Sequence, residues 1–392
     1  MRNRGLCLRL LLVILAARVL VFAEDKPSQP KKDAYEFTPV IQLKTTPVKN
    51  QAMTGTCWSF ATTSFVETEL IRMGKDEVIL SPMINVRFAY PRKAANFIRY
   101  AGLANFGGGG QAHDAMNAIR EYGFVPEETY KGMNIGEDKH NHGEMDAVLR
   151  AILDAVTAKK GGKITPVWPD AVNAVLDVYL GPLPKEFAFK GKTYTPRSFV
   201  ESTGFNPNDY VEFTSFSHHP FFTKIDLEVP DNWSKDLYYN VPIEDLMKIV
   251  DTSLEKGYSI VWDGDVSEKS YDRKTCVAVI PLDDDFGDEA EKGMGDQAEP
   301  SPIKEKAVTQ AMRQATFDNQ TTADDHLMNI TGIAHDQTGA KFYFTKNSWG
   351  TKDKKYGGYW YLSGPYVRLK TIAIMVHKSA IPPDIKAKLP SN

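Results

Sequence analysis

The hydrophobic pattern changes along this chain, and the change limits the folds that the chain can adopt. Residues 57–73 place apolar side chains at helical spacing and end at Gly74, and residues 112–122 form a second predicted helix. A further helix is expected at about 242–255. Strand-like segments follow at 259–262, 327–334, 342–346, 359–362 and 371–377. The pattern predicts an α+β fold with a helical lobe from the first part of the chain and a β-rich lobe from the last third.

The middle of the chain, residues 131–245, differs from the rest in composition and hydrophobic pattern. A helical stretch at 145–159 is followed by connections rich in proline and aromatic residues. We interpret this region as a helical insertion between a helical lobe at 39–130 and a β-rich lobe at 246–378, followed by a tail at 379–392. A chain of 392 residues is long enough for such a two-lobed unit.

The first residues have the order of a secretory signal peptide. Basic residues up to Arg4 precede an apolar run at 10–15, and small residues lead to Ala23. Arg18 interrupts the run before the roughly 20 apolar residues that a spanning helix needs, which argues against a membrane anchor. We therefore expect cleavage after Ala23, a flexible segment at 24–38, and export to the periplasm or outside the cell.

Composition excludes some functions and leaves few cysteines to consider. The formal net charge of -3 and the charged fraction of 25% give no sign of a nucleic-acid binder. An acidic stretch at 283–302 lacks the ligand spacing of an EF-hand and is interpreted as a solvated loop. After signal cleavage only Cys57 and Cys276 remain, and they could pair, but the residues around Cys57 favour a free thiol.

The segment from Gln51 to Ala61 has the features of a nucleophilic cysteine site. Cys57 is expected at a helix N-terminus, where the macrodipole favours a thiolate. Gln51 can place its amide beside the Cys57 N–H to form an oxyanion hole, and Gly55 allows the tight bend between them. A lone cysteine is more often a small buried hydrophobe, so the argument needs partner residues.

A histidine and an asparagine on the predicted strands supply those partners. His326 stands at the start of one strand and Asn347 follows the next, so a hairpin can place them side by side. The asparagine then fixes the imidazole tautomer and Trp349 shields that bond from water. We expect a thiolate–imidazolium pair between Cys57 and His326. The competing histidines are His113, His218, His219, His335 and His377.

These motifs together resemble the papain superfamily, and within it the bleomycin hydrolase and aminopeptidase C group. The agreement includes Gln51 to Ala61, Leu80-Ser-Pro82, Glu121 to Tyr130, Asp325-His326 and Asn347-Ser-Trp-Gly350, and it continues in the insertion at 194–199 and 239–242. Thr54 and Thr56 depart from the usual motif, and the paired cysteines of secreted papains are missing. The long separation of Cys57 from His326, compared with roughly 130 to 150 residues in small papain-like enzymes, fits an insertion.

The resemblance implies a papain-like two-lobed fold, a helical lobe plus a β-barrel-like lobe, and a cysteine peptidase. It implies that Cys57, His326, Asn347 and Gln51 are catalytic, and that Gly109, Gly110 and Trp349 contact substrate. The alternative interpretation of Gly109 and Gly110 is a flexible linker. No cofactor or metal is expected, and the partners are a peptide or protein substrate, with oligomers left open.

Two further expectations concern the ends of the chain. In the group that the sequence resembles, a C-terminal arm enters the cleft and its carboxylate receives the substrate's amino group. Here the resemblance ends near Asn392 with a shortened arm, which favours an endopeptidase over an aminopeptidase. The few residues between Ala23 and Pro39 also suggest activity without removal of a pro-segment. A thiol acyltransferase and a binding module without turnover are the alternatives.

Overall fold

The computed structural model describes residues 34–158, 162–282 and 302–390. The expected signal peptide and nearly all of the acidic stretch at 283–302 lie outside the described residues. Within the described residues, no helix combines the length and the apolar character that crossing a membrane requires.

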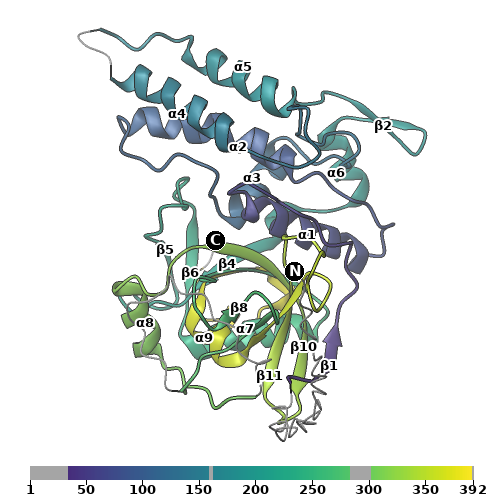
Figure 1. Cartoon of the computed structure of the whole chain (residues 1–392), viewed down its shortest axis with the longest axis vertical. Coiled ribbons are helices and arrows are strands. Elements are labelled where there is room, and N and C mark those ends of the chain that lie inside the picture. The colour runs from purple at the N-terminus through teal and green to yellow at the C-terminus, as the bar shows by residue number, and fades with distance from the viewer. Residues whose placement is uncertain (1–33, 159–161, 283–301, 391–392) are drawn as a thin grey trace, which may run out of the picture.

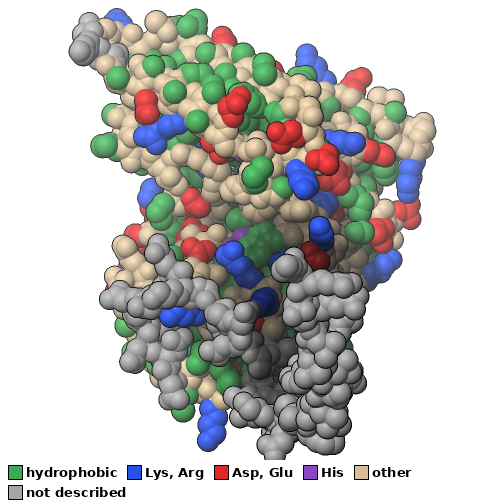
Figure 2. Space-filling model, in the orientation of Figure 1, with side chains coloured by type: hydrophobic (Ala, Val, Ile, Leu, Met, Phe, Trp, Pro, Cys, Tyr) green, Lys and Arg blue, Asp and Glu red, His purple; other side chains and the backbone are tan. Residues whose placement is uncertain are grey.

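The molecule has two lobes, one mainly helical and one built on a large sheet (Figure 1). The surface is recessed where the two lobes meet, at the waist of the space-filling view (Figure 2). The helical lobe contains α1 (Cys57–Arg72), α2 (Met83–Arg99), α3 (Ala112–Glu121), α4 (Gly143–Thr157), α5 (Trp168–Leu180) and α6 (Pro196–Thr203), with a hairpin of β2 (Phe187–Phe189) and β3 (Lys192–Tyr194). One continuous apolar cluster joins these helices.

Helix α1 is buried along almost its whole length. Every residue from Cys57 to Leu70 is buried, so the helix needs polar partners for its serines and threonines. Ser59 Oγ donates to the Pro82 carbonyl at 2.6 Å, and Asn329 of the sheet donates to Ser64 Oγ at 3.3 Å. These bonds fix α1 against both lobes.

The β lobe is one mixed sheet. Its strands from Thr223 onwards, in chain order, are β5 (Thr223–Asp226), β6 (Leu237–Asn240), β7 (Ile260–Gly264), β8 (Tyr271–Asp272), β9 (Val277–Ala278), β10 (His326–Asp336), β11 (Lys341–Lys346), β12 (Tyr359–Ser363) and β13 (Thr371–His377). The order is β5-β6-β4-β13-β7-β10-β11-β12-β9-β8, where β4 is Tyr210–Thr214, and β1 (Phe37–Gln42) pairs with β10. Helices α7 (Ile243–Glu255), α8 (Gln310–Asp318), α9 (Gly364–Lys370) and α10 (Pro383–Lys386) accompany it, with short 3-10 turns η1 (Pro207–Asp209) and η2 (Lys378–Ala380).

The helices and strands expected from periodicity are confirmed, but the interpretation of 131–245 as a helical insertion is wrong in its second half. Strand β4 pairs with β13, and β6 pairs with β4, so this part of the chain extends the main sheet. The proline-rich connections also contain a helix, α5. Pro169 is compatible with this helix because it lies in the first turn, where no backbone N–H is needed. The segment at 24–38 was expected to be flexible, but Tyr35 is buried and Phe37 begins β1.

The tail expected at 379–392 lies against α7 in its described part. Lys248 of α7 donates to Asp384 at 2.8 Å, and Lys388 lies 3.6 Å from Asp245. Ile385 is fully buried in the core of the β lobe. Residues 383–389 therefore belong structurally to the β lobe.

A buried carboxylate on α1 links the chain before the helix to the loop after it. Glu67 Oε1 accepts from the Leu80 N–H at 2.7 Å and lies 3.4 Å from Lys49 Nζ, while its other oxygen accepts from Thr46. Removing this carboxylate leaves the Lys49 ammonium, which is largely buried, without its most buried counter-charge.

We predict that Glu67→Ala lowers the free energy of unfolding by about 3 kcal/mol in urea denaturation, as expected for breaking a buried pair. Glu77→Ala is the control, because the Glu77–Lys44 pair is exposed and should contribute below about 1 kcal/mol. Equal effects of the two substitutions would contradict a structural role for Glu67.

Candidate active site

Cys57 is the first residue of α1 and lies beside the start of β10. Its side chain is 8% exposed, and the Leu327 backbone is within hydrogen-bonding range of the thiol. No side chain caps this end of α1, and the Cys57 N–H has no acceptor among the described residues. The helix N-terminus therefore presents a thiol and a free N–H donor at the same place.

His326 and Asn347 meet as the sequence predicted. Strands β10 and β11 pair, with Asn329 opposite Lys346, and this register brings the start of β10 next to the end of β11. His326 Nε2 lies 2.8 Å from Asn347 Oδ1, so Nε2–H donates and Nδ1 is left as the basic nitrogen. Asn347 Nδ2 donates in turn to the Tyr271 hydroxyl at 3.3 Å.

Trp349 covers this pair on one side. Its ring centroid is 4.6 Å from the His326 ring, and it packs edge-on against Trp360 at 5.5 Å. The Arg273 guanidinium lies 5.1 Å from the Trp349 ring. The His326–Asn347 bond is thus shielded from water, as the sequence argument required.

Gln51 is held by two hydrogen bonds that orient its amide. Ser348 Oγ donates to Gln51 Oε1 at 2.6 Å, and Gln51 Nε2 donates to the Thr54 carbonyl at 2.9 Å. One N–H of the amide is left without an acceptor among the described residues. Because Ser348 directly follows Asn347, one turn positions both side chains.

The glycine segment is packed in place and is not a flexible linker. The Lys93 ammonium donates to the carbonyls of Gly107 and Gly109, and Trp58 Nε1 donates to Gly108 at 2.9 Å. A Cβ on Gly110 would lie 2.8 Å from Asp114 Oδ2, so no side chain fits there. The Gly109 carbonyl is therefore already engaged, and only other groups of this segment are free to meet a substrate.

Burial sets the protonation states of the two central residues. It raises the pKa of Cys57 to about 12, and the charges of Asp324, Asp263 and Asp231 add to the rise. It lowers the pKa of His326 to about 4, against the opposing effect of Asn347. Both groups are neutral near pH 7 in this arrangement, whereas the sequence predicted a thiolate–imidazolium pair.

Comparison with known proteins assigns the family. Residues 170–392, more than half of the chain, match the Peptidase C1-like family, and residues 38–149 match the papain family of cysteine proteases. The chain belongs to the Peptidase C1-like family. It is a papain-type cysteine peptidase.

Its relatives among characterised proteins are distant but cover most of the chain. Aminopeptidase G of Lactobacillus delbrueckii subsp. lactis is 24% identical, over 89% of this chain and 85% of its own. Bleomycin hydrolase of Rattus norvegicus is 23% identical, over 90% and 85% respectively. The crystal structure of PepW from Lactobacillus rhamnosis HN001 has the same fold, with a TM-score of 0.69, 18% identity, and coverage of 90% of this chain and 84% of that one.

The histidines that competed with His326 in the sequence argument make contacts elsewhere in the structure. His113 Nδ1 lies 2.7 Å from Glu212 and its Nε2 lies 3.0 Å from Ser234 Oγ. Burial alone would lower the pKa of His113, but the Glu212 carboxylate raises it to about 9. His335 pairs within β10 opposite Lys341, and His377 stacks on Tyr258.

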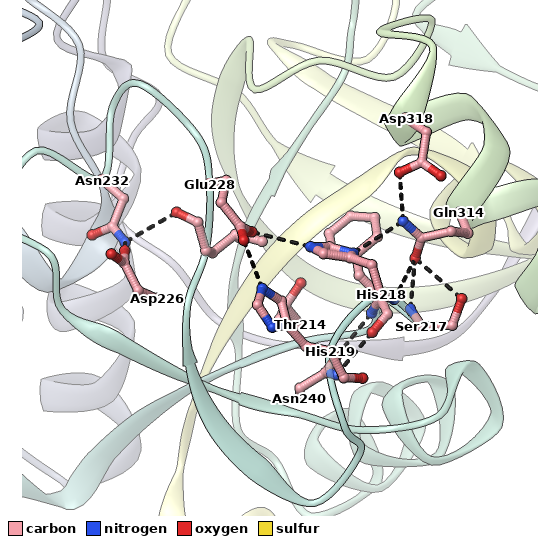
Figure 3. Close-up of polar contacts among 12 residues, drawn as sticks. Thr214, Ser217, His218, His219, Asp226, Glu228, Asn232, Asn240, Gln314 and Asp318 are labelled. Carbon is pink, nitrogen blue, oxygen red and sulfur yellow. Dashed lines mark hydrogen bonds and ion pairs between the residues drawn. The ribbon is translucent and has the colours of Figure 1, made fainter.

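His218 and His219 point at one carboxylate, Glu228, in a cluster with the spacing of a metal site (Figure 3). Their Nε2 atoms lie 3.1 and 2.6 Å from the two Glu228 oxygens. However, Gln314 Nε2 donates to His218 Nδ1 at 3.0 Å while Gln314 Oε1 accepts from Ser217. An imidazole that accepts at Nδ1 carries its proton on Nε2, the atom that a metal would need. The cluster is better explained as a hydrogen-bonded support for its loop.

The sequence argument missed two groups of residues at this site. Tyr271 and Ser348 fix Asn347 and Gln51, and no motif marks either role. Three aspartates from distant segments raise the pKa of the Cys57 thiol through their charges: Asp231, Asp263 and Asp324. Only Asp324 had a local signal, because it lies two residues before His326.

The neutral state of the thiol has a measurable consequence. A neutral thiol reacts only through its thiolate fraction, so alkylation of Cys57 by iodoacetamide should accelerate about tenfold per pH unit across the neutral and mildly alkaline range. Cys57 should still react faster than Cys276, because the Cys57 side chain is partly accessible whereas Cys276 is fully buried. Cys276→Ala is the control and should leave the profile unchanged. A rate that stays constant from acid to alkaline pH would show a preformed ion pair instead.

Proposed function

We propose that this Peptidase C1-like enzyme hydrolyses peptide bonds with Cys57 as nucleophile, His326 as general base and acid, Asn347 as orienting residue and Gln51 as oxyanion donor. The observation that carries the proposal is the 2.8 Å bond from His326 Nε2 to Asn347, which leaves Nδ1 as the proton acceptor in a site that begins with a thiol at a helix N-terminus.

The reaction proceeds through a thioester. Cys57 Sγ attacks the carbonyl carbon while its proton passes to His326, so that no free thiolate has to persist in the buried site. The Cys57 N–H and the Gln51 amide hold the oxyanion. His326 then protonates the leaving amine, the tetrahedral species collapses to the acyl-enzyme, and a water deprotonated by His326 releases the acid and restores the thiol.

We further propose that the enzyme acts as an aminopeptidase, the reverse of the preference drawn from the sequence. Several relatives bear the name aminopeptidase, and Asp231 supports the choice structurally. A Cβ on Gly109 would lie 2.0 Å from Asp231 Oδ2, so this carboxylate occupies the space directly above the Gly109 backbone. If the acyl side of the substrate runs along Gly109 and Gly110, Asp231 limits how far it can extend past Cys57.

Substitutions should separate the roles of the four residues. Cys57→Ala should remove hydrolysis almost wholly, and Gln51→Ala should lower kcat on the order of 10²-fold, as for loss of an oxyanion donor. Asn347→Ala should be milder than His326→Ala, because it removes orientation and not the base. Steady-state kinetics on a peptide amide give the ranking, with Cys276→Ala as control. Full activity of His326→Ala would refute the assignment.

The direction of cleavage is tested on a peptide and on its N-acetylated form. We expect residues to be released one at a time from the free amino end, as followed by mass spectrometry, and slow cleavage of the acetylated form. Internal cleavage of both forms at similar rates would establish the endopeptidase that the sequence favoured.

A further inference from the structure

Three aspartates from separate segments gather beside the nucleophile. Asp263 lies on β7, Asp324 precedes β10, and Asp231 lies in the β5–β6 loop, which rises towards the helical lobe in Figure 1. Asp263 is paired across the sheet with Leu327, whose backbone approaches the Cys57 thiol. All three carboxylates lie within electrostatic range of that thiol.

One member of the cluster is buried and two are partly exposed. Asp263, which is only 2% exposed, is called the floor, and Asp231 and Asp324, which are partly exposed, are called the rim. Asn105 donates to Asp231 Oδ1 at 2.8 Å, and Gln111 Nε2 donates to Asp324 Oδ2 at 2.8 Å. The rim carboxylates are therefore held in position by neutral donors.

The floor of the cluster is poorly satisfied. The Asp263 carboxyl contacts the Asp324 carboxyl and the Gln111 amide, but neither of its oxygens accepts a well-formed hydrogen bond, and the Tyr238 hydroxyl, which is buried near Asp263 and Asp324, has no partner among the described residues. A buried carboxylate without a partner is costly, and such atoms in native proteins call for an explanation. Two carboxyl groups therefore face each other with no cationic donor from the described residues between them.

Within the described residues, two members of the cluster also lack a positively charged partner. No lysine or arginine of the described residues forms an ion pair with Asp263 or Asp324. Lys93 acts on Asp231, but it also faces Asp114 and Asp146, and its ammonium is bound to the glycine carbonyls. Burial and the neighbouring carboxylates accordingly raise the pKa of Asp324 to about 7 and that of Asp263 well above its usual range.

We propose that Asp263, Asp324 and Asp231 form a receptor for a cationic nitrogen of the substrate, which enters beside Cys57 and donates to the facing carboxyl groups of Asp263 and Asp324. The chemistry required is a protonated amine, which has several N–H donors and one positive charge, and a peptide supplies it as its α-ammonium group or as a lysine side chain. The inference rests on the proposed peptidase function and adds the group by which the substrate is selected.

Binding of such a cation would also act on the nucleophile. The charges of the three aspartates contribute to the raised pKa of Cys57, so a bound positive charge offsets that contribution and makes loss of the thiol proton easier. Selection of the substrate and activation of the thiol would then be coupled through one cluster.

The test uses the full chain and three coumarin amides: leucyl amide with a free amino group, N-acetyl-leucyl amide and N-acetyl-lysyl amide. We expect kcat/KM for a cationic substrate to exceed that for N-acetyl-leucyl amide by about 10- to 100-fold, as for a charge-assisted hydrogen bond. Preference for the free leucyl amide identifies the α-ammonium as the ligand, and preference for N-acetyl-lysyl amide identifies the side chain.

Asp263→Asn and Asp324→Asn should each remove most of this preference, mainly through KM. Asp170→Asn on α5 is the control, because it makes the same change in net charge at an exposed site in the outer part of the helical lobe (Figure 1). Iodoacetamide labelling of Cys57 verifies that each variant keeps an intact site. If Asp263→Asn does not fold, the substrate preference of Asp324→Asn is the deciding measurement, because Asp324 is partly exposed.

Hydrolysis that depends on Cys57 but shows no preference for a cation, or a preference that survives both substitutions, would overturn this inference and leave the peptidase assignment standing. Absence of any Cys57-dependent hydrolysis would overturn the proposed function itself. The two failures are therefore distinguishable.

Discussion

The packing of α1 against β10 is the contact on which the rest of the site depends. Helix α1 carries Cys57 at its first residue, and β10 carries His326 at its first residue, so both reacting groups sit at ends of elements that pack against each other. Neither element could shift without separating the two. The buried polar bonds from Ser59 and Asn329 give this contact a direction that apolar packing alone would not supply, because hydrogen bonds require particular atoms to meet.

That packing has an electrostatic cost. Enclosing a thiol, an imidazole and several carboxylates in one water-poor region disfavours every charged form, which raises the pKa of Cys57 and lowers that of His326. A site of this kind keeps its groups neutral until a substrate alters the balance. The same low polarity strengthens hydrogen bonds to an oxyanion once it forms, so enclosure that suppresses the resting thiolate also favours the transition state.

The sequence predicted individual helices and strands better than features that depend on contacts between distant segments. The helix at Cys57 and the strands at His326 and Asn347 have clear periodicity and chemistry close in the chain. Helix α5 was missed because Pro169 reads as a helix breaker, although it occupies the first turn. Strands β4 to β6 were missed because short strands are decided by their partners, here β13, which lies far along the sequence. The aspartate cluster has no sequence signature, since its members meet only through the fold.

The second half of the middle region explains how one domain can both extend a sheet and shape a cleft. Its strands β4 and β6 join the sheet, but the loop from β5 to β6 crosses to the helical lobe. Trp233 donates to Asp114 at 2.9 Å and its carbonyl accepts from Asn96, while Asp231 is held by Asn105. Contacts to α2, α3 and the intervening loop anchor the middle of the loop to the helical lobe, while β5 and β6 hold its two ends in the sheet. A carboxylate on such a loop is held as firmly as one on a strand, which lets Asp231 complete a cluster whose other two members lie on β7 and just before β10.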